Sequence, residues 1–373
     1  MKVCLVTAEF FCWGNYGGFG AFTRKLAKEL VKHGIGVKVL MGYKYPFQPS
    51  FGKSVFIDGA CVTTLPNVRD RLLNHNLFKT DADIIHSQND PLNTYFVFKS
   101  NPSVPKVVTI QDLRTPEERK RLTADSPSIE WGMPGGKQIL LSPVVWHCAR
   151  SNLKHANVVA CQAHLLKPKI KSVLNYSGRP LFLPNFVEIP ESQTLKKSDR
   201  PTVVFLGRLD SVKNPELTFD VAKKVPNIDF YILGSTRTQG RTLWLQKQAE
   251  GIDNLHLLGH NSGNLKEKLL SEAWVLINTS YYECMPVSFL EALAHKCCLL
   301  STQNPDGYTE SFGFYDKSFS VNGLVYGLNF LIKNDVWRLK GECGYEYVKK
   351  VHNIEKGIED HICLYKTLLD SKK

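Results

Sequence analysis

The chain contains no run of about 18 or more apolar residues, which is the length that a membrane-spanning helix needs. Its first residues, MKVCLVTAEFF, are apolar, but they form too short a segment and lack a small-residue cleavage site. We therefore expect a buried strand at the N-terminus and neither a signal peptide nor a spanning helix. Internal repeats and low-complexity tracts are also missing.

Cysteines with the paired spacing of metal ligands are absent too. The ten cysteines are scattered, Cys297 and Cys298 are adjacent, and no CxxC occurs. Free, mostly buried thiols in a reducing cytoplasm fit this pattern. A cytoplasmic location is therefore expected.

The loop after the first expected strand, GNYGGFG, has neither the GxGxxG pattern nor the Lys-Ser/Thr of a Walker loop. Its Gly17 and Gly18 would still let backbone N–H groups approach a phosphate closely, because they carry no Cβ. A flexible turn is the alternative interpretation.

The net charge of +12 is confined to one half of the chain. Residues 1–197 carry 26 Lys and Arg against 14 Asp and Glu, whereas residues 198–373 carry 21 of each. This imbalance suggests an anionic partner for the first half, such as a phosphorylated substrate or an acidic membrane surface; a general solubility effect is the alternative. No nucleic-acid-binding motif accompanies the charge, so nucleic acid is not an expected partner.

Strand-like and helix-like stretches alternate along the 373 residues, a length that suits two domains. The first half starts with a strand at 1–8, a helix at 21–33 and a strand from Gly36. The second half has a strand at 202–206, a helix at 215–225 and a strand at 229–234. This alternation predicts parallel sheets covered by helices. The polar stretch 188–201 is the best linker candidate, and residues 337–369 are expected to be helical.

The stretch Asn278–Cys298, NTSYYECMPVSFLEALAHKCC, carries the densest candidate site. Pro286 suits the first position of a helix, where its missing N–H would be unpaired anyway. Glu283 would then precede the helix and Glu291 would lie on its second turn. First-turn N–H groups and the helix dipole favour a phosphate or another anion. The alternative is an ordinary helix with solvated acids.

Other candidates follow the ends of expected strands, where open α/β sheets bind ligands. Arg208 and Lys213 flank the turn after strand 202–206 and are suited to phosphate oxygens. Gln111 and Asp112 follow a strand at 106–110. Asp81 and Asp83 form a DxD pair, but they precede a strand, so we interpret them as part of a turn and not as a metal site.

Taken together these segments resemble the retaining GT-B glycosyltransferases of family 4, the glycosyl transferases group 1 type. The resemblance rests on GNYGGFG, LPNFV, VVFLGRLDSVKNPELTFDVAKKVPNIDFYILG and TSYYECMPVSFLEALAHKCCLLST. It implies an α/β fold of two Rossmann-like domains with parallel sheets that face a central cleft. Residues 1–190 would bind the acceptor, 200–352 the nucleotide sugar, and helix 353–373 would return to the first domain.

The resemblance also implies roles for individual residues. Arg208 and Lys213 would hold the donor diphosphate, Glu291 the ribose, and Glu283 the transferred sugar. Backbone N–H groups around Met285, Pro286 and Val287 would assist, and Gly17 and Gly18 would approach the diphosphate. No metal and no cofactor would be needed, and the donor would be a UDP- or GDP-sugar.

The activity implied is that of a retaining hexosyltransferase (EC 2.4) in glycan biosynthesis, acting on a glycan, lipid-linked or phosphorylated acceptor. The basic first half adds an expected peripheral contact with anionic membrane, which salt should weaken. Gln111 departs from the family, which often has a His there, and Gln cannot carry a proton. A catalytically degenerate nucleotide-sugar-binding protein of the same fold is therefore the alternative. Cys284 also replaces a family glycine, and so does either His295 or Lys296.

Overall fold

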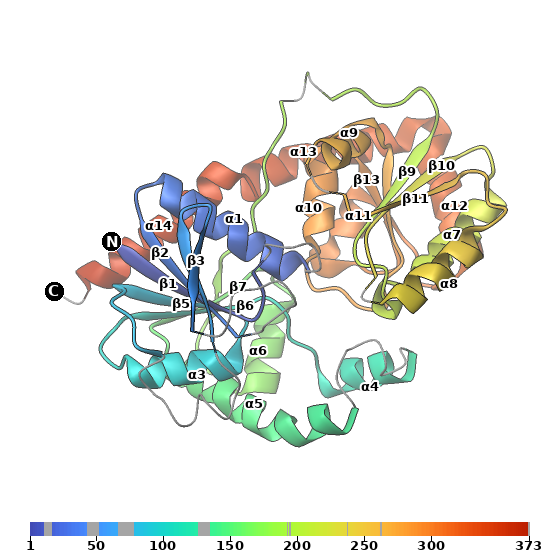
Figure 1. Ribbon diagram of the computed structural model, residues 1–373. Coiled ribbons are helices and arrows are strands. Elements are labelled where there is room, and N and C mark those ends of the chain that lie inside the picture. Colours follow the sequence, from blue (N-terminus) through green and yellow to red (C-terminus); the bar gives the residue numbers. More distant parts are fainter. Residues whose placement is uncertain are drawn as a thin grey trace. The chain divides into compact units, whose positions relative to one another are not determined.

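The computed structural model describes residues 1–10, 17–42, 52–65, 78–125, 135–191, 193, 195–236, 238–261 and 263–371. The chain forms two compact units (Figure 1). The first comprises residues 1–115, 134–185 and 355–373, and the second comprises residues 116–133 and 186–354.

The first unit is built on an eight-stranded sheet with the order β3-β4-β2-β1-β5-β6-β7-β8 (Figure 1). The strands are β1 (Lys2–Thr7), β2 (Gly36–Met41), β3 (Ser54–Ile57), β4 (Ala60–Thr64), β5 (Ile84–Gln88), β6 (Lys106–Ile110), β7 (Val158–Cys161) and β8 (Leu181–Phe182). Only the hairpin of β3 and β4 is antiparallel. Every residue of β5 and β6 is buried, as expected of strands covered on both faces.

The helices of the first unit are α1 (Gly18–Lys32), α3 (Pro91–Ser100), α5 (Gly135–His155), α6 (Leu166–Leu174) and α14 (Ile354–Asp370). Helix α1 buries an apolar stripe of Phe22, Leu26, Ala27 and Leu30. It begins at Gly18 and not at Ala21, and Gly20 is the buried residue of this added turn.

The second unit is built on a six-stranded, fully parallel sheet with the order β11-β10-β9-β12-β13-β14. Its strands are β9 (Thr202–Leu206), β10 (Asp229–Leu233), β11 (Leu255–Gly259), β12 (Val275–Asn278), β13 (Cys298–Ser301) and β14 (Gly313–Tyr315). The chain runs from β9 outward to β11 and then returns to β12 on the other side of β9. This reversal places a topological switch point between β9 and β12, where open α/β sheets bind ligands.

The α-helices described in the second unit are α4 (Pro116–Asp125), α7 (Pro215–Lys224), α8 (Gln239–Ala249), α9 (Asn264–Glu272), α10 (Val287–Ala294), α11 (Tyr308–Phe312), α12 (Val321–Ile332) and α13 (Val336–Val351). Phe219, Phe230 and Trp337 are among the largest side chains of the buried core. Helix α10 starts one residue later than predicted, because Pro286 has an extended ψ of 130° and occupies the N-cap. The two parallel-sheet units confirm the predicted α/β class.

Helix α14 joins the core of the first unit through polar groups that are fully buried. The hydroxyl of Tyr365 lies 2.6 Å from Nδ1 of His86 on β5, and Nε2 of His86 lies 2.7 Å from Oγ1 of Thr109. The ring of His361 lies 5.8 Å from that of His86, and its Nδ1 donates to the carbonyl of Gly357. Burial lowers the pKa of His361 to about 4 and lowers the pKa of His86 as well.

These two histidines should make the first unit sensitive to acid. Unfolded histidine titrates near its ordinary pKa of 6.5, so between pH 6.5 and 4 the unfolded chain binds more protons at position 361. Stability is therefore fully present above pH 6.5 and falls toward pH 4, with His361 contributing about 3 kcal/mol of the loss. We expect His361→Gln to lose less free energy of unfolding between pH 7 and pH 4.5 than the unaltered chain does, as measured by urea unfolding at both pH values.

His33 provides a matched control, because its exposed ring makes the same bond to the carbonyl four residues earlier, that of Glu29. His33→Gln should leave the loss of stability as it is in the unaltered chain. If His361→Gln and the unaltered chain lose the same free energy of unfolding between pH 7 and pH 4.5, the role given to His361 is wrong.

Candidate functional site

The loops that follow β9 and β12 meet at the switch point of the second unit. Lys213 ends a short 3-10 turn, Ser211–Lys213, and Asn214 then adopts a left-handed conformation with φ of 46°. The hydroxyl of Thr279 donates to the carbonyls of Lys213 and Asn214, and the N–H of Tyr281 donates to that of Val212. These bonds tie two segments together that are about 70 residues apart in sequence.

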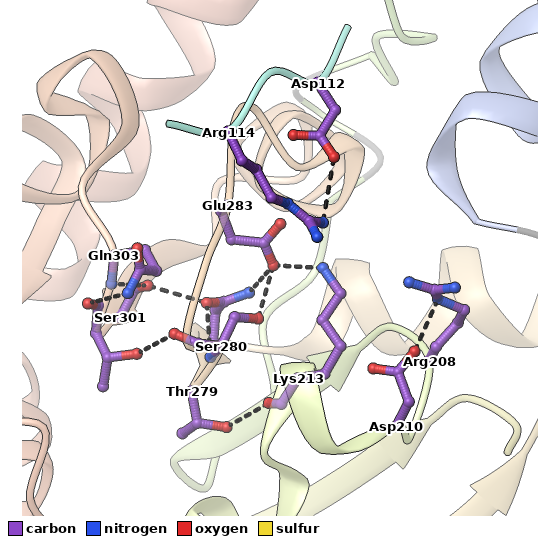
Figure 2. Close-up of polar contacts among 12 residues, drawn as sticks. Asp112, Arg114, Arg208, Asp210, Lys213, Thr279, Ser280, Glu283, Ser301 and Gln303 are labelled. Atoms are coloured by element: carbon purple, nitrogen blue, oxygen red, sulfur yellow. Dashed lines mark hydrogen bonds and ion pairs between the residues drawn. The ribbon is translucent and has the colours of Figure 1, made fainter. Parts of the chain in front are cut away.

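The centre of this site is an ion pair between Lys213 and Glu283 (Figure 2). Nζ of Lys213 lies 2.5 Å from Oε1 of Glu283, and the two side chains are only 20% and 7% exposed. The same oxygen accepts from Oγ of Ser280 at 2.7 Å and from Nδ2 of Asn278 at 3.0 Å. No described residue donates to the second oxygen of Glu283, so that oxygen is available to accept a ligand hydroxyl.

A further polar layer holds Asn278 in place. Its Oδ1 accepts from the N–H of Ser280 and from the hydroxyl of Ser301, which lies at the end of the neighbouring strand β13. The hydroxyl of Ser301 in turn accepts from the N–H of Gln303. Asn278 and Ser280 lie in the predicted stretch 278–298, but no role was predicted for them or for Ser301, although polar residues at the ends of adjacent parallel strands were a usable signal.

Arg208 and Asp210 form a second ion pair on the loop after β9 (Figure 2). Nε of Arg208 lies 3.3 Å from Oδ2 of Asp210, and the Arg208 side chain is 26% exposed. The other oxygen of Asp210, Oδ1, is buried without a hydrogen-bond partner among the described residues. Arg208 therefore presents its remaining guanidinium N–H groups from a fixed position.

The N-terminus of α10 follows Glu283 after a short turn. Met285 is buried, and Pro286 at the N-cap makes no side-chain capping bond. The N–H groups of Val287 and Ser288 belong to the first turn, where a helix supplies no acceptor of its own. This end of the helix thus offers hydrogen-bond donors and a partial positive charge to an anion.

Glu291, on the second turn of α10, belongs to a charged group that the sequence analysis did not predict. Nζ of Lys266 on α9 lies 2.8 Å from Oε1 of Glu291 and 3.3 Å from Oε1 of Glu267. Nε2 of His295 lies 2.9 Å from Oε2 of Glu267, and its Nδ1 donates to the carbonyl of Glu291. The bond from His295, together with Lys266, lowers the pKa of Glu267 to about 2, although burial opposes this. Burial also opposes the charge of Lys266, but the two glutamates outweigh it and raise its pKa.

In the first unit, Gln111 lies at the end of β6 with no exposed surface. Its Nε2 donates to Oε1 of Gln88, while its main-chain carbonyl accepts from Gln162. Its Oε1 is buried and has no partner among the described residues. A direct contact between Gln111 and a substrate would require this side chain to become exposed.

Gly17 is the N-cap of α1 and Gly18 is its first residue, and the N–H of Gly17 donates to Oε2 of Glu9 at 3.2 Å. The N–H of Gly17, which was predicted to approach a phosphate, thus donates to the carboxylate of Glu9. The preceding loop residues 11–16 lie outside the described part of the chain.

Asp81 and Asp83 bind the start of β1, since they accept from the side chain and the main-chain N–H of Lys2 at 2.6 and 2.7 Å. Both lie in the segment directly before β5. Within the described ranges, no three His, Cys, Asp or Glu side chains are grouped so as to hold a metal ion. Over the same part of the chain, no helix combines the length and apolarity needed to cross a membrane.

The geometry of the second unit suits a ligand that is both anionic and hydroxylated. Arg208, Lys213 and the start of α10 supply donors for phosphate oxygens. Glu283 and Glu291 supply carboxylate oxygens, which accept from hydroxyl groups. Of the predicted site residues, the structure joins Lys213 directly to Glu283, whereas Arg208 and Glu291 bind other partners.

Part of the chain matches a known family. Residues 188–334 match the model described as Glycosyl transferases group 1. The O-antigen biosynthesis glycosyltransferase WbnH and the probable O-antigen biosynthesis glycosyltransferase WbiN, both from Escherichia coli, are each 32% identical over 157 residues. These matches cover 41% of this chain and 39% of each relative, so they span about two fifths of the relatives' length.

Solved structures match over nearly the whole chain at low identity. Sucrose-phosphate synthase from Thermosynechococcus elongatus gives a TM-score of 0.75 at 17% identity and covers 99% of both chains. HepE of Anabaena, solved in complex with UDP-glucose, gives a TM-score of 0.73 at 14% identity, and the match covers 100% of both chains. WaaG, a glycosyltransferase involved in lipopolysaccharide biosynthesis, gives 0.64 at 14% identity and covers 96% of this chain and 98% of that one.

The fold is therefore GT-B. The stretch that matches the glycosyl transferases group 1 model, residues 188–334, forms most of the second unit. This confirms the resemblance to group 1 glycosyl transferases. Retention of configuration and membership of family 4 stay predictions.

The pair of Lys213 and Glu283 should contribute measurably to stability. Because both side chains are largely buried, losing one partner leaves the other charge poorly compensated. We expect a double-mutant cycle of Lys213→Met and Glu283→Gln to give a coupling energy of about 1–3 kcal/mol in urea unfolding.

The exposed pair of Lys268 and Glu272 on α9 serves as the control cycle, with side chains that are 68% and 40% exposed. Its coupling energy should stay below about 0.5 kcal/mol. Equal coupling in the two cycles would show that Lys213 and Glu283 do not form a buried pair.

Proposed function

We propose that the chain is a retaining glycosyltransferase that transfers a sugar from a nucleotide-sugar donor to a hydroxyl group of an acceptor. The donor diphosphate binds Arg208, Lys213 and the first-turn N–H groups of α10. The free oxygen of Glu283 accepts from a hydroxyl of the transferred sugar, and Glu291 binds the ribose.

The observation that carries this proposal is the fixed contact between Lys213 and Glu283. It joins a cation suited to the leaving phosphate and a carboxylate suited to the sugar at 2.5 Å, at the switch point of a parallel sheet. Both residues lie within the stretch that matches the glycosyl transferases group 1 model.

The reaction requires stabilisation of the departing diphosphate. The acceptor hydroxyl oxygen bonds to the anomeric carbon on the face from which the diphosphate leaves, and the bond from that carbon to the phosphate oxygen breaks. The leaving phosphate oxygen takes the hydroxyl proton, so the products are the glycoside and the nucleoside diphosphate. Arg208, Lys213 and the helix N-terminus stabilise the negative charge that develops on the leaving oxygen, and no metal ion is required.

The donor and acceptor classes follow from the relatives and from the charge of the chain. The complex of HepE with UDP-glucose supports a UDP-sugar, and a GDP-sugar is the second candidate. The O-antigen glycosyltransferases WbnH and WbiN support a glycan or lipid-linked acceptor. The excess of 12 positive charges in residues 1–197 favours an anionic or membrane-attached acceptor and a peripheral membrane contact in the cytoplasm.

A specific observation favours a second candidate, a nucleotide-sugar-binding protein without turnover. The family often has His where this chain has Gln111, and Gln111 is fully buried with its amide bonded to Gln88. An amide cannot carry a proton. Binding of a donor without transfer or hydrolysis would support this candidate.

The first test is a thermal-shift screen against UDP-, GDP- and ADP-sugars, followed by measurement of transfer or donor hydrolysis. A bound donor raises the melting temperature by mass action. Arg208→Ala and Lys213→Ala should each lower turnover roughly 10²–10³-fold, by analogy with lost oxyanion donors. Glu291→Ala should mainly raise the KM for the donor.

Lys223 provides a control for the loss of a lysine. It lies on α7, the helix that follows Lys213, and forms an exposed ion pair with Asp220 of the same helix. Lys223→Ala should turn over at the rate of the unaltered chain. Near-normal rates in both Arg208→Ala and Lys213→Ala would refute the proposed site.

A further inference from the structure

Lys266 lies where it can act on the same ligand group as Glu291. It is the third residue of α9, and its Nζ lies 2.8 Å from Oε1 of Glu291. Both side chains are 19% exposed, so the pair reaches the surface while most of each side chain is covered.

The remaining hydrogen-bonding capacity of the pair is complementary. A lysine ammonium has three N–H donors. Two of those of Lys266 face Glu291 and Glu267, and no described residue accepts from the third. No described residue donates to Oε2 of Glu291 either. A free donor and a free acceptor therefore lie side by side.

The pair is held by groups around it. Glu267 binds both Lys266 and the largely buried His295, and His295 donates to the main-chain carbonyl of Glu291. The side chains of α9 and the C-terminal end of α10 are thereby joined in a closed ring of contacts. Such support keeps a donor and an acceptor in place before a ligand arrives.

We propose that Lys266 and Glu291 together bind the vicinal diol of the donor ribose. Oε2 of Glu291 accepts from one ribose hydroxyl, and Nζ of Lys266 donates to the oxygen of the other. The inference rests on the proposed function and adds Lys266 to the donor site, where the sequence resemblance implied Glu291 alone. The charge of Lys266 also offsets that of Glu291, which would otherwise repel the donor diphosphate.

The test compares a nucleoside diphosphate with its 2′-deoxy and 3′-deoxy analogues by isothermal titration calorimetry on the full chain. UDP is the probe, or GDP or ADP if either gives the larger thermal shift. The unaltered chain should bind the parent nucleotide more tightly than both analogues. Lys266→Met should weaken the parent roughly tenfold, the scale of a hydrogen bond to a charged group. It should also abolish discrimination against one analogue, while Glu291→Gln abolishes discrimination against the other.

Two further variants separate a ligand contact from a structural role. Lys266→Gln keeps an N–H donor and should retain part of the discrimination that Lys266→Met loses. Lys268→Met, on the same helix but with an exposed lysine, should bind all three nucleotides as the unaltered chain does. The melting temperature of each variant without ligand checks that it is folded.

Equal weakening of all three nucleotides in Lys266→Met would overturn the inference, because a lysine that only supports Glu291 predicts that result. Equal affinity of the unaltered chain for the parent and both analogues would overturn it together with the assignment of the ribose to Glu291, while leaving the proposed glycosyl transfer intact. If none of UDP, GDP and ADP binds the unaltered chain, the proposed function fails and the inference fails with it.

Discussion

The bond from Lys213 to Glu283 depends on the pairing of two neighbouring parallel strands. Residues of β12 pair with β9, Val275 beside Val203, so the loops after both strands start at the same edge of the sheet. Thr279 then binds the backbone of the β9 loop, which brings the lysine to the carboxylate. The helix that begins a few residues after Glu283 is thereby aligned with the same edge. The position of the whole candidate site follows from this one pairing.

Each cation of the candidate site is accompanied by a carboxylate. Arg208 binds Asp210, Lys213 binds Glu283, and Lys266 binds Glu291. Residues 198–373, which contain all three pairs, have equal numbers of positive and negative side chains. Such pairing holds the long side chains in defined places before a ligand arrives, which lowers the entropy lost on binding. It also leaves one oxygen of Glu283 and one of Glu291 to accept from hydroxyls, while Arg208 and Lys213 keep N–H donors for phosphate.

The sequence predicted the fold class well, because buried parallel strands are continuous apolar runs such as those of β5 and β6. It located Lys213 and Glu283, since both follow strands that apolar runs identify. It could not predict their contact. The alternation of strands and helices does not determine the strand order, and the contact forms because β12 lies next to β9 in the sheet. The link between Lys266 and Glu291 was missed for a similar reason, as it joins two helices whose spacing depends on the packed sheet. The hairpin of β3 and β4 was missed because its short strands are half exposed.

The most direct test of this account is a crystal structure of the chain with a bound nucleoside diphosphate, UDP first. The account predicts a diphosphate oxygen within hydrogen-bonding distance of Lys213 Nζ and of a main-chain N–H of Val287 or Ser288. A nucleotide bound elsewhere, with Lys213 contacting only Glu283, would contradict it.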